Sequence, residues 1–255
     1  MKSISADIML FPETNVMWNR YDVQTFARQY RHNTFDFSHQ NTSNSIHTYN
    51  SAYQPGGTCS ILTNNLVGRF HSSDTNQTFG QWTIMTINIK QNRKLSIICC
   101  YQVCDQTSNS VGPKTAFNQQ WSILKQQGNP YPRPRKQFIT DLDKTLSQLR
   151  NKGHSIVLAG DFNTTVGEQP FGLDMILNKY SLIDSMQYLH GEYECSTYAR
   201  GTKCIDYIFA STDLLPAIKS GGIPLLDAIT SSDHHAIFID VHIPSCLESE
   251  LSCLL

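Results

Sequence analysis

The sequence lacks an excess of charge of either sign. Its 20 lysine and arginine residues nearly balance its 21 aspartate and glutamate residues, and the formal net charge is −1 at pH 7. A basic field over the whole molecule, which would draw the protein to nucleic acids in general, is therefore excluded. Any contact with a polyanion has to be local or has to be carried by a metal ion.

Long apolar runs and a secretion signal are also lacking. No apolar stretch approaches the ~20 residues that a helix needs to span a bilayer. The run from Ile8 to Phe11 is too short for a signal peptide. The eight cysteines do not form the Cys-x-x-Cys pairs of a zinc site. These absences predict free thiols and an intracellular protein, nuclear or cytoplasmic, without a membrane partner.

What is present is typical of a single globular domain. The chain has 255 residues, of which 40% are hydrophobic and 16% are charged, so it can bury a large core. No internal repeat and no shift in composition divides it. We therefore expect one domain over residues 1–244, followed by a polar C-terminal tail over residues 245–255.

Hydrophobic patterning predicts many strands and a few helices. This mixture favours a two-layered α/β sandwich. The expected strands are residues 7–11, 58–63, 66–70, 82–89, 94–101, 156–159, 193–198, 203–210 and 236–243; the expected helices are residues 22–32, 115–127, 135–151 and 173–179; residues 39–57 and 71–79 are expected to be loops.

The stretch from Ser155 to Asn163 carries the clearest functional signal. Residues 156–159 form a short apolar run that is typical of a buried strand. Asp161 and Asn163 follow it, and period-two geometry places both on the same side of the strand. Because a carboxylate and an amide at the mouth of a buried strand need polar partners, this spacing indicates a site. A turn capped by Asp and Asn is the alternative.

Further acids stand at or near other strand ends. Glu13 follows the strand over residues 7–11, Asp206 lies in a later strand, and Asp233 and His234 precede the last strand. Each has a simpler interpretation. Glu13 can be a loop acid, and Asp206 can be a buried structural carboxylate. Asp233 can cap a turn, and His234 can be a hydrogen-bonded structural histidine.

Together the acids fit the hydrolysis of a phosphate ester. Mg²⁺ prefers carboxylate oxygens and keeps several waters. Glu13 and Asp233 can supply such oxygens, and Mn²⁺ is an alternative ion. Asp161 can orient or deprotonate the attacking water.

The remaining polar residues complete this chemistry. His234 can donate to the phosphoryl group while Asp206 holds its ring and favours its protonated form. Asn163 and Tyr101 are neutral donors that suit phosphate oxygens.

Five blocks occur in a fixed order along the chain: Pro12-Glu13-Thr14, Tyr101, Gly160-Asp161-Phe162-Asn163, Ile205-Asp206-Tyr207-Ile208-Phe209 and Ser232-Asp233-His234. This order resembles the endonuclease/exonuclease/phosphatase superfamily over residues 7–243. It is most similar to abasic-site endonucleases and to the endonuclease domains of non-LTR retrotransposons. The resemblance implies a four-layered α/β sandwich and Mg²⁺-dependent cleavage of phosphodiesters.

The resemblance also implies a role for each site residue. Glu13 and Asp233 are implied as metal ligands, and Asp161 as the acid that activates water. By the same resemblance His234 pairs with Asp206, while Asn163 and Tyr101 contact phosphate.

Two features depart from the superfamily pattern. Its members begin with a core strand that ends in an asparagine, ahead of the Pro-Glu-Thr block. This chain starts about one helix too late, so we expect the first core strand to be missing. Proline and asparagine often follow the superfamily's tyrosine, whereas Gln102-Val103-Cys104 follow Tyr101 here. This difference weakens the expected phosphate contact.

Three functional hypotheses follow. The first is a Mg²⁺-dependent endonuclease that hydrolyses DNA, of retroelement or abasic-site type. Arg133, Arg135 and Lys136 would then contact backbone phosphates, or else form a solvated helix start.

The second hypothesis is a phosphatase of inositol lipids or a sphingomyelinase. The sequence around Cys204-Ile205-Asp206 argues against it, because those enzymes carry a Trp-Cys-Asp-Arg type block there. The third is an inactive, truncated remnant of a retroelement endonuclease domain.

Overall fold

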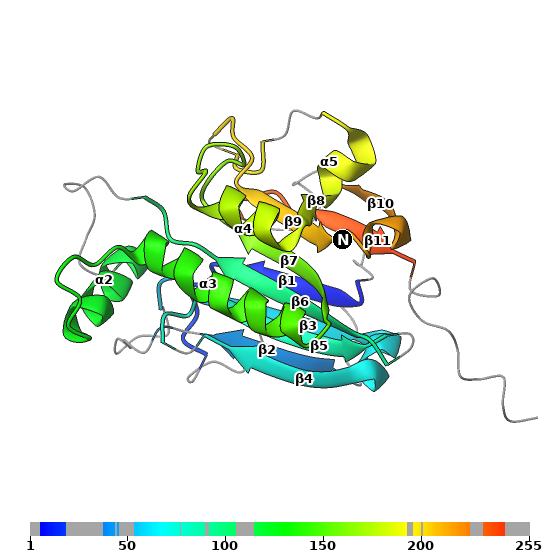
Figure 1. Cartoon of the computed structure of the whole chain (residues 1–255), viewed down its shortest axis with the longest axis horizontal. Coiled ribbons are helices and arrows are strands. Elements are labelled where there is room, and N and C mark those ends of the chain that lie inside the picture. Colours follow the sequence, from blue (N-terminus) through cyan, green and yellow to red (C-terminus); the bar gives the residue numbers. More distant parts are fainter. Residues whose placement is uncertain are drawn as a thin grey trace, which may run out of the picture.

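Figure 1 shows the architecture of the chain in a computed structural model. The structure describes residues 6–18, 38–43, 45, 54–76, 78–89, 92–105, 115–192, 196–199, 201–224 and 232–242. The helix expected over residues 22–32 and the tail expected over residues 245–255 lie outside these described residues. Within them, no helix combines the length and the apolarity that crossing a bilayer requires.

The larger sheet has six strands in the order β4-β5-β6-β7-β9-β8. β6 and β7 run parallel, and the other neighbours are antiparallel. The parallel pair requires a crossover connection, which helices α2 (Ala116–Gln126) and α3 (Pro134–Asn151) provide. The strands are β4 (Phe70–Thr75), β5 (Trp82–Asn88), β6 (Lys94–Tyr101), β7 (Ser155–Asp161), β8 (Leu182–Asp184) and β9 (Asp206–Ser211).

Two smaller sheets cover one face of the larger sheet. The first has the order β1-β3-β2, and the second pairs β10 with β11. β1 contacts β6 and β7, β3 contacts β5 and β6, and β2 contacts β4 and β5. In Figure 1 the labels of the β1-β3-β2 sheet therefore alternate with those of the larger sheet, from β7 down to β4. The strands are β1 (Ile8–Pro12), β2 (Ser38–Ser43), β3 (Thr58–Thr63), β10 (Ile218–Gly222) and β11 (Phe238–Val241).

Helices cover the opposite face of the larger sheet. α3 and α4 (Leu173–Tyr180) cross in front of it in Figure 1. Two short 3₁₀ helices and one short α-helix complete the described elements: η1 (Asn64–Arg69), η2 (Leu215–Ala217) and α5 (Ser185–His190). The layered α/β sandwich with packed sheets and flanking helices confirms the fold class expected from the sequence.

Strand β7 lies at the centre of both cores. Ile156 and Leu158 pack with Phe138 of α3 and the rest of the core under the helices. Val157 points the other way, into the core between the sheets that includes Leu62 of β3. Since each buried side chain of this size contributes about 1.5–3 kcal/mol, both faces hold β7 in place. A strand covered on both faces is expected to be a continuous apolar run, as residues 156–159 are.

Most expected elements are confirmed, with small shifts at their ends. β3 and β6 match their expected ranges, and β1, β5, β7, β9, β11, α2, α3 and α4 differ from theirs by a few residues. Residues 196–198 do not form the expected strand, and only Tyr198 makes an isolated bridge there, to His234.

Three expectations were wrong along the sheet edges. Residues 66–70 were expected to be a strand, but η1 occupies most of them. Residues 39–43 and 71–75 were expected to be loops, but they belong to β2 and β4. Both strands are polar and lie at the ends of their sheets, where a strand has few apolar neighbours. Their hydrogen-bonded partners β3 and β5, rather than their own hydrophobic pattern, make them strands.

Gly160 allows β6 and β7 to approach closely just before Asp161. Its φ is +143°, and a Cβ atom there would lie 1.9 Å from the carbonyl oxygen of Cys100. We expect Gly160→Ala to lower the free energy of unfolding by about 3 kcal/mol or more, because both backbones would have to move. Urea unfolding measures this change. Gly68→Ala, with nothing within 4 Å of the added Cβ, is the control and should change stability by less than ~0.5 kcal/mol. Equal stability of the two variants would contradict the expectation.

Candidate active site

Three neighbouring strands of the larger sheet place polar side chains in one row. Tyr101 at the end of β6 is in register with Asp161 at the end of β7. Asp161 is in turn directly opposite Asp206, the first residue of β9. The two aspartates are only 2% and 8% exposed. Like charges directly opposite each other destabilise a sheet, so these carboxylates require positive partners.

His234 is the partner of Asp206. Its Nδ1 atom lies 2.9 Å from Oδ2 of Asp206. This hydrogen bond raises the pKa of His234 to about 9, against the opposing effect of burial. The backbone N–H of His234 donates to Oγ of Ser232 at 3.0 Å, and the ring lies 5.1 Å from that of Tyr198. The imidazole is therefore oriented on several sides and is held in its protonated form near neutral pH.

Asp161 is held by Asn163, and the positive charge of His234 lies nearby. The backbone N–H of Asn163 donates to Oδ1 at 2.8 Å, and its amide Nδ2 donates to Oδ2 at 2.9 Å. Burial, followed by the negative charge of Asp206, raises the pKa of Asp161 to about 8. The amide of Asn163 also donates to the carbonyl of Gln102 at 2.8 Å and accepts from Sγ of Cys104 at 3.0 Å. Asn163 thus positions Asp161 in this structure.

Glu13 reaches the site from the other sheet. It follows β1 directly, and Oη of Tyr101 donates to its Oε1 at 3.1 Å. Burial raises the pKa of Glu13 more than the Tyr101 hydrogen bond lowers it, and the nearby charge of Asp233 raises it further. The φ of Glu13 is +48°, that of Asn15 is +55° and that of Asn163 is +47°. Such backbone conformations are uncommon outside glycine and concentrate at functional sites.

Neighbouring backbone holds the strained turn after Glu13. The N–H groups of Thr14 and Asn15 donate to the carbonyls of Gly57 and Gly56 at 3.1 and 2.9 Å. The N–H of Gly56 donates back to Oδ1 of Asn15 at 2.9 Å. These three bonds offset the cost of the positive φ angles and fix the carboxylate in the site.

The side chains converge on one point. Glu13, Asp161 and His234 each offer one potential ligand atom, and these atoms lie within 4.8 Å of one another. Because Asp206 keeps His234 protonated, the donors for a cation are the carboxylates of Glu13 and Asp161. Two buried carboxylates with raised pKa values suit a hard divalent ion, which would favour their ionised forms. The donor set therefore fits a divalent metal.

The structure brings together six of the seven residues predicted from the sequence. Glu13, Tyr101, Asp161, Asn163, Asp206 and His234 are linked by the contacts given above. Asp233 lies outside the cluster formed by Glu13, Asp161 and His234, but it is close enough for its charge to act on Glu13.

Sequence reasoning missed the support that this group receives from Thr197, and it named Arg135 only as a candidate phosphate contact. Thr197 is fully buried, and its Oγ1 accepts from the N–H groups of Ile205 and Asp206, both at 3.0 Å. Arg135 donates from Nη1 to the carbonyl of Val103 at 2.7 Å and from Nη2 to that of Asn163 at 3.2 Å. No pattern marks Thr197, because a single threonine far from its partners carries no periodic signal.

The layered α/β sandwich gathers buried acids and a histidine–aspartate pair at its strand ends, an arrangement that suits the class of phosphoric-ester hydrolases. Within this class, the chain belongs to the Endonuclease/Exonuclease/phosphatase family, whose model matches residues 1–234. Members of this family generally use divalent metals, which agrees with the donor set described above.

Several solved structures share this fold at low sequence identity. The 3' phosphatase NExo from Neisseria, bound to product DNA hairpin, is 14% identical, with 92% of this chain and 88% of that chain covered and a TM-score of 0.58. The AP endonuclease LMAP from Leishmania major is 11% identical, with 91% and 77% covered and a TM-score of 0.61. The catalytic domain of Xenopus laevis APE2 is 14% identical, with 92% and 83% covered and a TM-score of 0.61. No curated protein matches the sequence.

The contact between His234 and Asp206 generates a test by titration. We expect Asp206→Asn to lower the pKa of His234 from about 9 toward or below the ordinary value of 6.5, because the charged partner is lost. NMR titration of the imidazole in the presence of a chelator measures this shift. A raised histidine pKa stabilises the fold fully below pH ~6.5, and this contribution is lost as the pH rises through about 9. Asp206→Asn should remove that pH dependence.

The control for this titration is Asp143→Asn. Asp143 forms an ion pair on the surface with Lys179, so its loss should leave the pKa of His234 unchanged. An unaltered pKa in Asp206→Asn would show that the hydrogen bond does not control the protonation of His234.

Proposed function

We propose that this protein is a Mg²⁺-dependent phosphodiesterase that cleaves DNA as an endonuclease, with Mn²⁺ as an alternative ion. The observation that carries the proposal is the convergence of Glu13, Asp161 and His234 within 4.8 Å at the end of the sandwich. These residues come from the turn after β1, the end of β7 and the segment before β11, so only the folded chain unites them.

Glu13 and the neighbouring Asp233 are proposed to hold the metal ion, together with an oxygen of Asp161. A bound divalent cation would stabilise negative charge on the phosphoryl oxygens and on the leaving group. Tyr101 keeps the Glu13 carboxylate oriented through its hydroxyl group. This arrangement leaves water or substrate oxygens to complete the coordination, as Mg²⁺ prefers.

Asp161 is proposed to orient and deprotonate the attacking water. Both of its oxygens accept from Asn163, which fixes the plane of the carboxylate. Its raised pKa makes it a stronger base than an exposed aspartate. The proton from water would pass to a carboxylate oxygen of Asp161 as the new bond to phosphorus forms. The bond from phosphorus to one sugar oxygen would break, and that oxygen would leave with the electron pair and then take up a proton from water.

His234 is proposed to donate a hydrogen bond to a phosphoryl oxygen. Asp206 binds Nδ1, and the other ring nitrogen carries a proton in the imidazolium form. A preoriented donor aimed at developing negative charge is among the largest single contributions to catalysis. Asp206 acts through His234 and is a positioning residue.

DNA is proposed as the substrate, of either the abasic-site or the retroelement type. The structural neighbours support a nucleic-acid substrate, since they include AP endonucleases and a phosphatase bound to product DNA. The segment Cys204-Ile205-Asp206 lacks the Trp-Cys-Asp-Arg type block expected of inositol phosphatases. This difference favours DNA over inositol lipids.

Substitution of the proposed base or donor tests the chemistry. We expect Asp161→Ala and His234→Ala each to reduce Mg²⁺-dependent nicking of plasmid DNA by roughly 10²-fold or more. Plasmids with and without abasic sites, assayed beside inositol phosphates, identify the substrate class. Circular dichroism checks that the variants are folded. Asp143→Asn, at the exposed ion pair with Lys179, is the control, and wild-type rates in both site variants would refute the assignment.

The proposed metal site has a separate test. We expect Glu13→Gln to weaken divalent-ion binding by roughly tenfold or more, because an amide oxygen replaces a carboxylate ligand. The Mg²⁺ dependence of cleavage and direct Mn²⁺ binding by electron paramagnetic resonance both report this change. Glu168→Gln, at an exposed ion pair with Lys203, is the matched control. If Glu13→Gln bound Mn²⁺ as the wild type does, Glu13 would be no ligand.

A further inference from the structure

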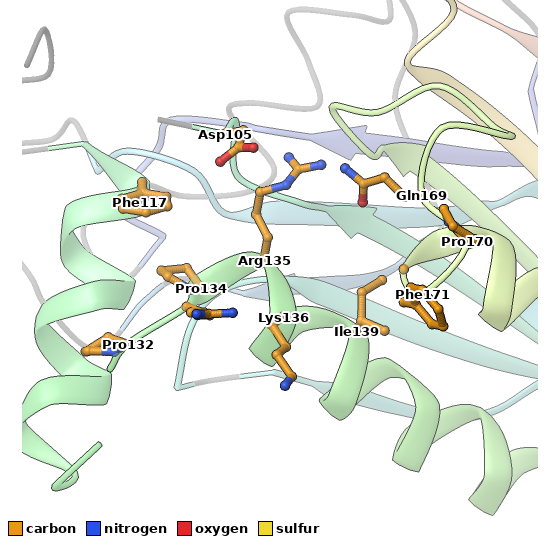
Figure 2. A pocket seen from close by; sticks show the side chains of 12 residues that line it. Asp105, Phe117, Pro132, Pro134, Arg135, Lys136, Ile139, Gln169, Pro170 and Phe171 are labelled. Atoms are coloured by element: carbon orange, nitrogen blue, oxygen red, sulfur yellow. The ribbon is translucent and has the colours of Figure 1, made fainter. Parts of the chain in front are cut away.

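A cavity of about 560 Å³ opens beside the active site. Its walls are the start of α3, the segment before it and α2 on one side, and the loop after β7 on the other (Figure 2). This volume lies within the ~300–1,000 Å³ range of small-ligand sites. No residue that we have assigned to catalysis lines the cavity, so it is a separate feature of the same surface.

The charge of the lining is positive. Arg133, Arg135 and Lys136 line the cavity with Asp105 as the one acid among the lining residues. Arg133 and Lys136 are exposed, whereas Arg135 uses its guanidinium to hold the carbonyls of Val103 and Asn163. In a chain with a net charge of −1, this concentration of cations is local and complements an anionic ligand.

An aromatic ring stands at the rim of the cavity. The side chain of Phe171 is 93% exposed, and Figure 2 places it beside Pro170, across the cavity from Phe117. A phenyl ring so exposed adds no core burial to the fold. Bases that are not stacked in a duplex bind to such rings, whichever base they carry.

The cavity is connected to the active site by the chain itself. The loop that leaves β7 contains Asn163, which holds Asp161, and reaches the cavity at residues 169–172. Arg135 contacts both places, because it lines the cavity and its guanidinium donates to the carbonyl of Asn163. A nucleic-acid strand with one phosphodiester at Asp161 therefore has neighbouring nucleotides within reach of the cavity.

We propose that the cavity binds an unstacked nucleotide of the substrate strand next to the bond that is cleaved. Phe171 stacks on its base, and Arg133 and Lys136 contact its flanking phosphates. The inference rests on the proposed function, because it assumes that a nucleic-acid strand enters the active site. It predicts preference for single-stranded or distorted DNA, since a base stacked within a duplex cannot enter a concave pocket.

Binding of a fluorescein-labelled single-stranded oligonucleotide of roughly ten nucleotides, measured by anisotropy in the presence of a chelator, tests the base contact. We expect Phe171→Ala to weaken binding roughly tenfold through lost stacking, without altering the salt dependence. Tyr188→Ala, which removes another exposed aromatic side chain from α5, should bind as the wild type does.

The salt dependence of the same binding tests the phosphate contacts. We expect the double variant Arg133→Ala with Lys136→Ala to reduce the slope of log K against log salt by about 1.4, since each phosphate contact on a single strand contributes about 0.7. Lys144→Ala, an exposed lysine further along α3, should leave the slope unchanged. An unchanged slope in the double variant would remove both cations from the interface.

Oligonucleotides that lack one base locate the stacked nucleotide. At one position in the strand, loss of the base should weaken wild-type binding roughly tenfold and should have no further effect on Phe171→Ala. If removal of a base and the Phe171→Ala substitution weakened binding additively at every position, the proposed stacking contact would be overturned. Because binding is measured without a metal, the outcome is separate from cleavage. If the wild-type protein bound the oligonucleotide but did not cleave DNA, the proposed function would be refuted. If the wild-type protein cleaved DNA and the cavity variants bound the oligonucleotide as tightly as it does, only the proposed nucleotide site in the cavity would be refuted.

Discussion

The structure depends on two buried carboxylates that face each other across neighbouring strands. Asp161 and Asp206 are in direct register and almost inaccessible to water. Their repulsion would destabilise the centre of the sheet if both were ionised without partners. His234 neutralises Asp206, whereas Asp161 is left with hydrogen bonds from Asn163 and a raised pKa. The raised pKa values of Asp161 and Glu13 show that the site disfavours their ionised forms, which a bound divalent cation would stabilise.

The surrounding backbone is arranged to keep these groups in place. The positive φ angles of Glu13 and Asn163 occur where the chain turns from a strand into the site. Hydrogen bonds from the 56–57 loop hold the first turn, and Arg135 holds the carbonyl of the second. Local strain is tolerated because the two sheets and α3 hold the chain on either side. The site is therefore built before any ligand arrives.

Electrostatics divides the surface into two functional parts. The acids at the strand ends suit a cation, while the cavity before α3 gathers cations that suit phosphates. A strand of nucleic acid that crosses the active site and the cavity would meet a bound metal ion at the acids and the positive side chains of the cavity beside it. With this division, a chain without overall positive charge would meet the proposed polyanionic substrate through local positive groups.

The sequence determined the central strands and helices α2 to α4, and it singled out six polar residues that the fold gathers in one place, because apolar runs and strand-end acids are local signals. It did not determine the polar edge strands β2 and β4, whose pairing depends on their neighbours. Nor did it determine that Thr197 holds the backbone at Asp206, that the Asn163 amide is hydrogen-bonded to Asp161 and Gln102, or that a cavity lies beside Phe171. These arise when segments far apart in the chain are brought into register, and register is set by packing of the whole sandwich.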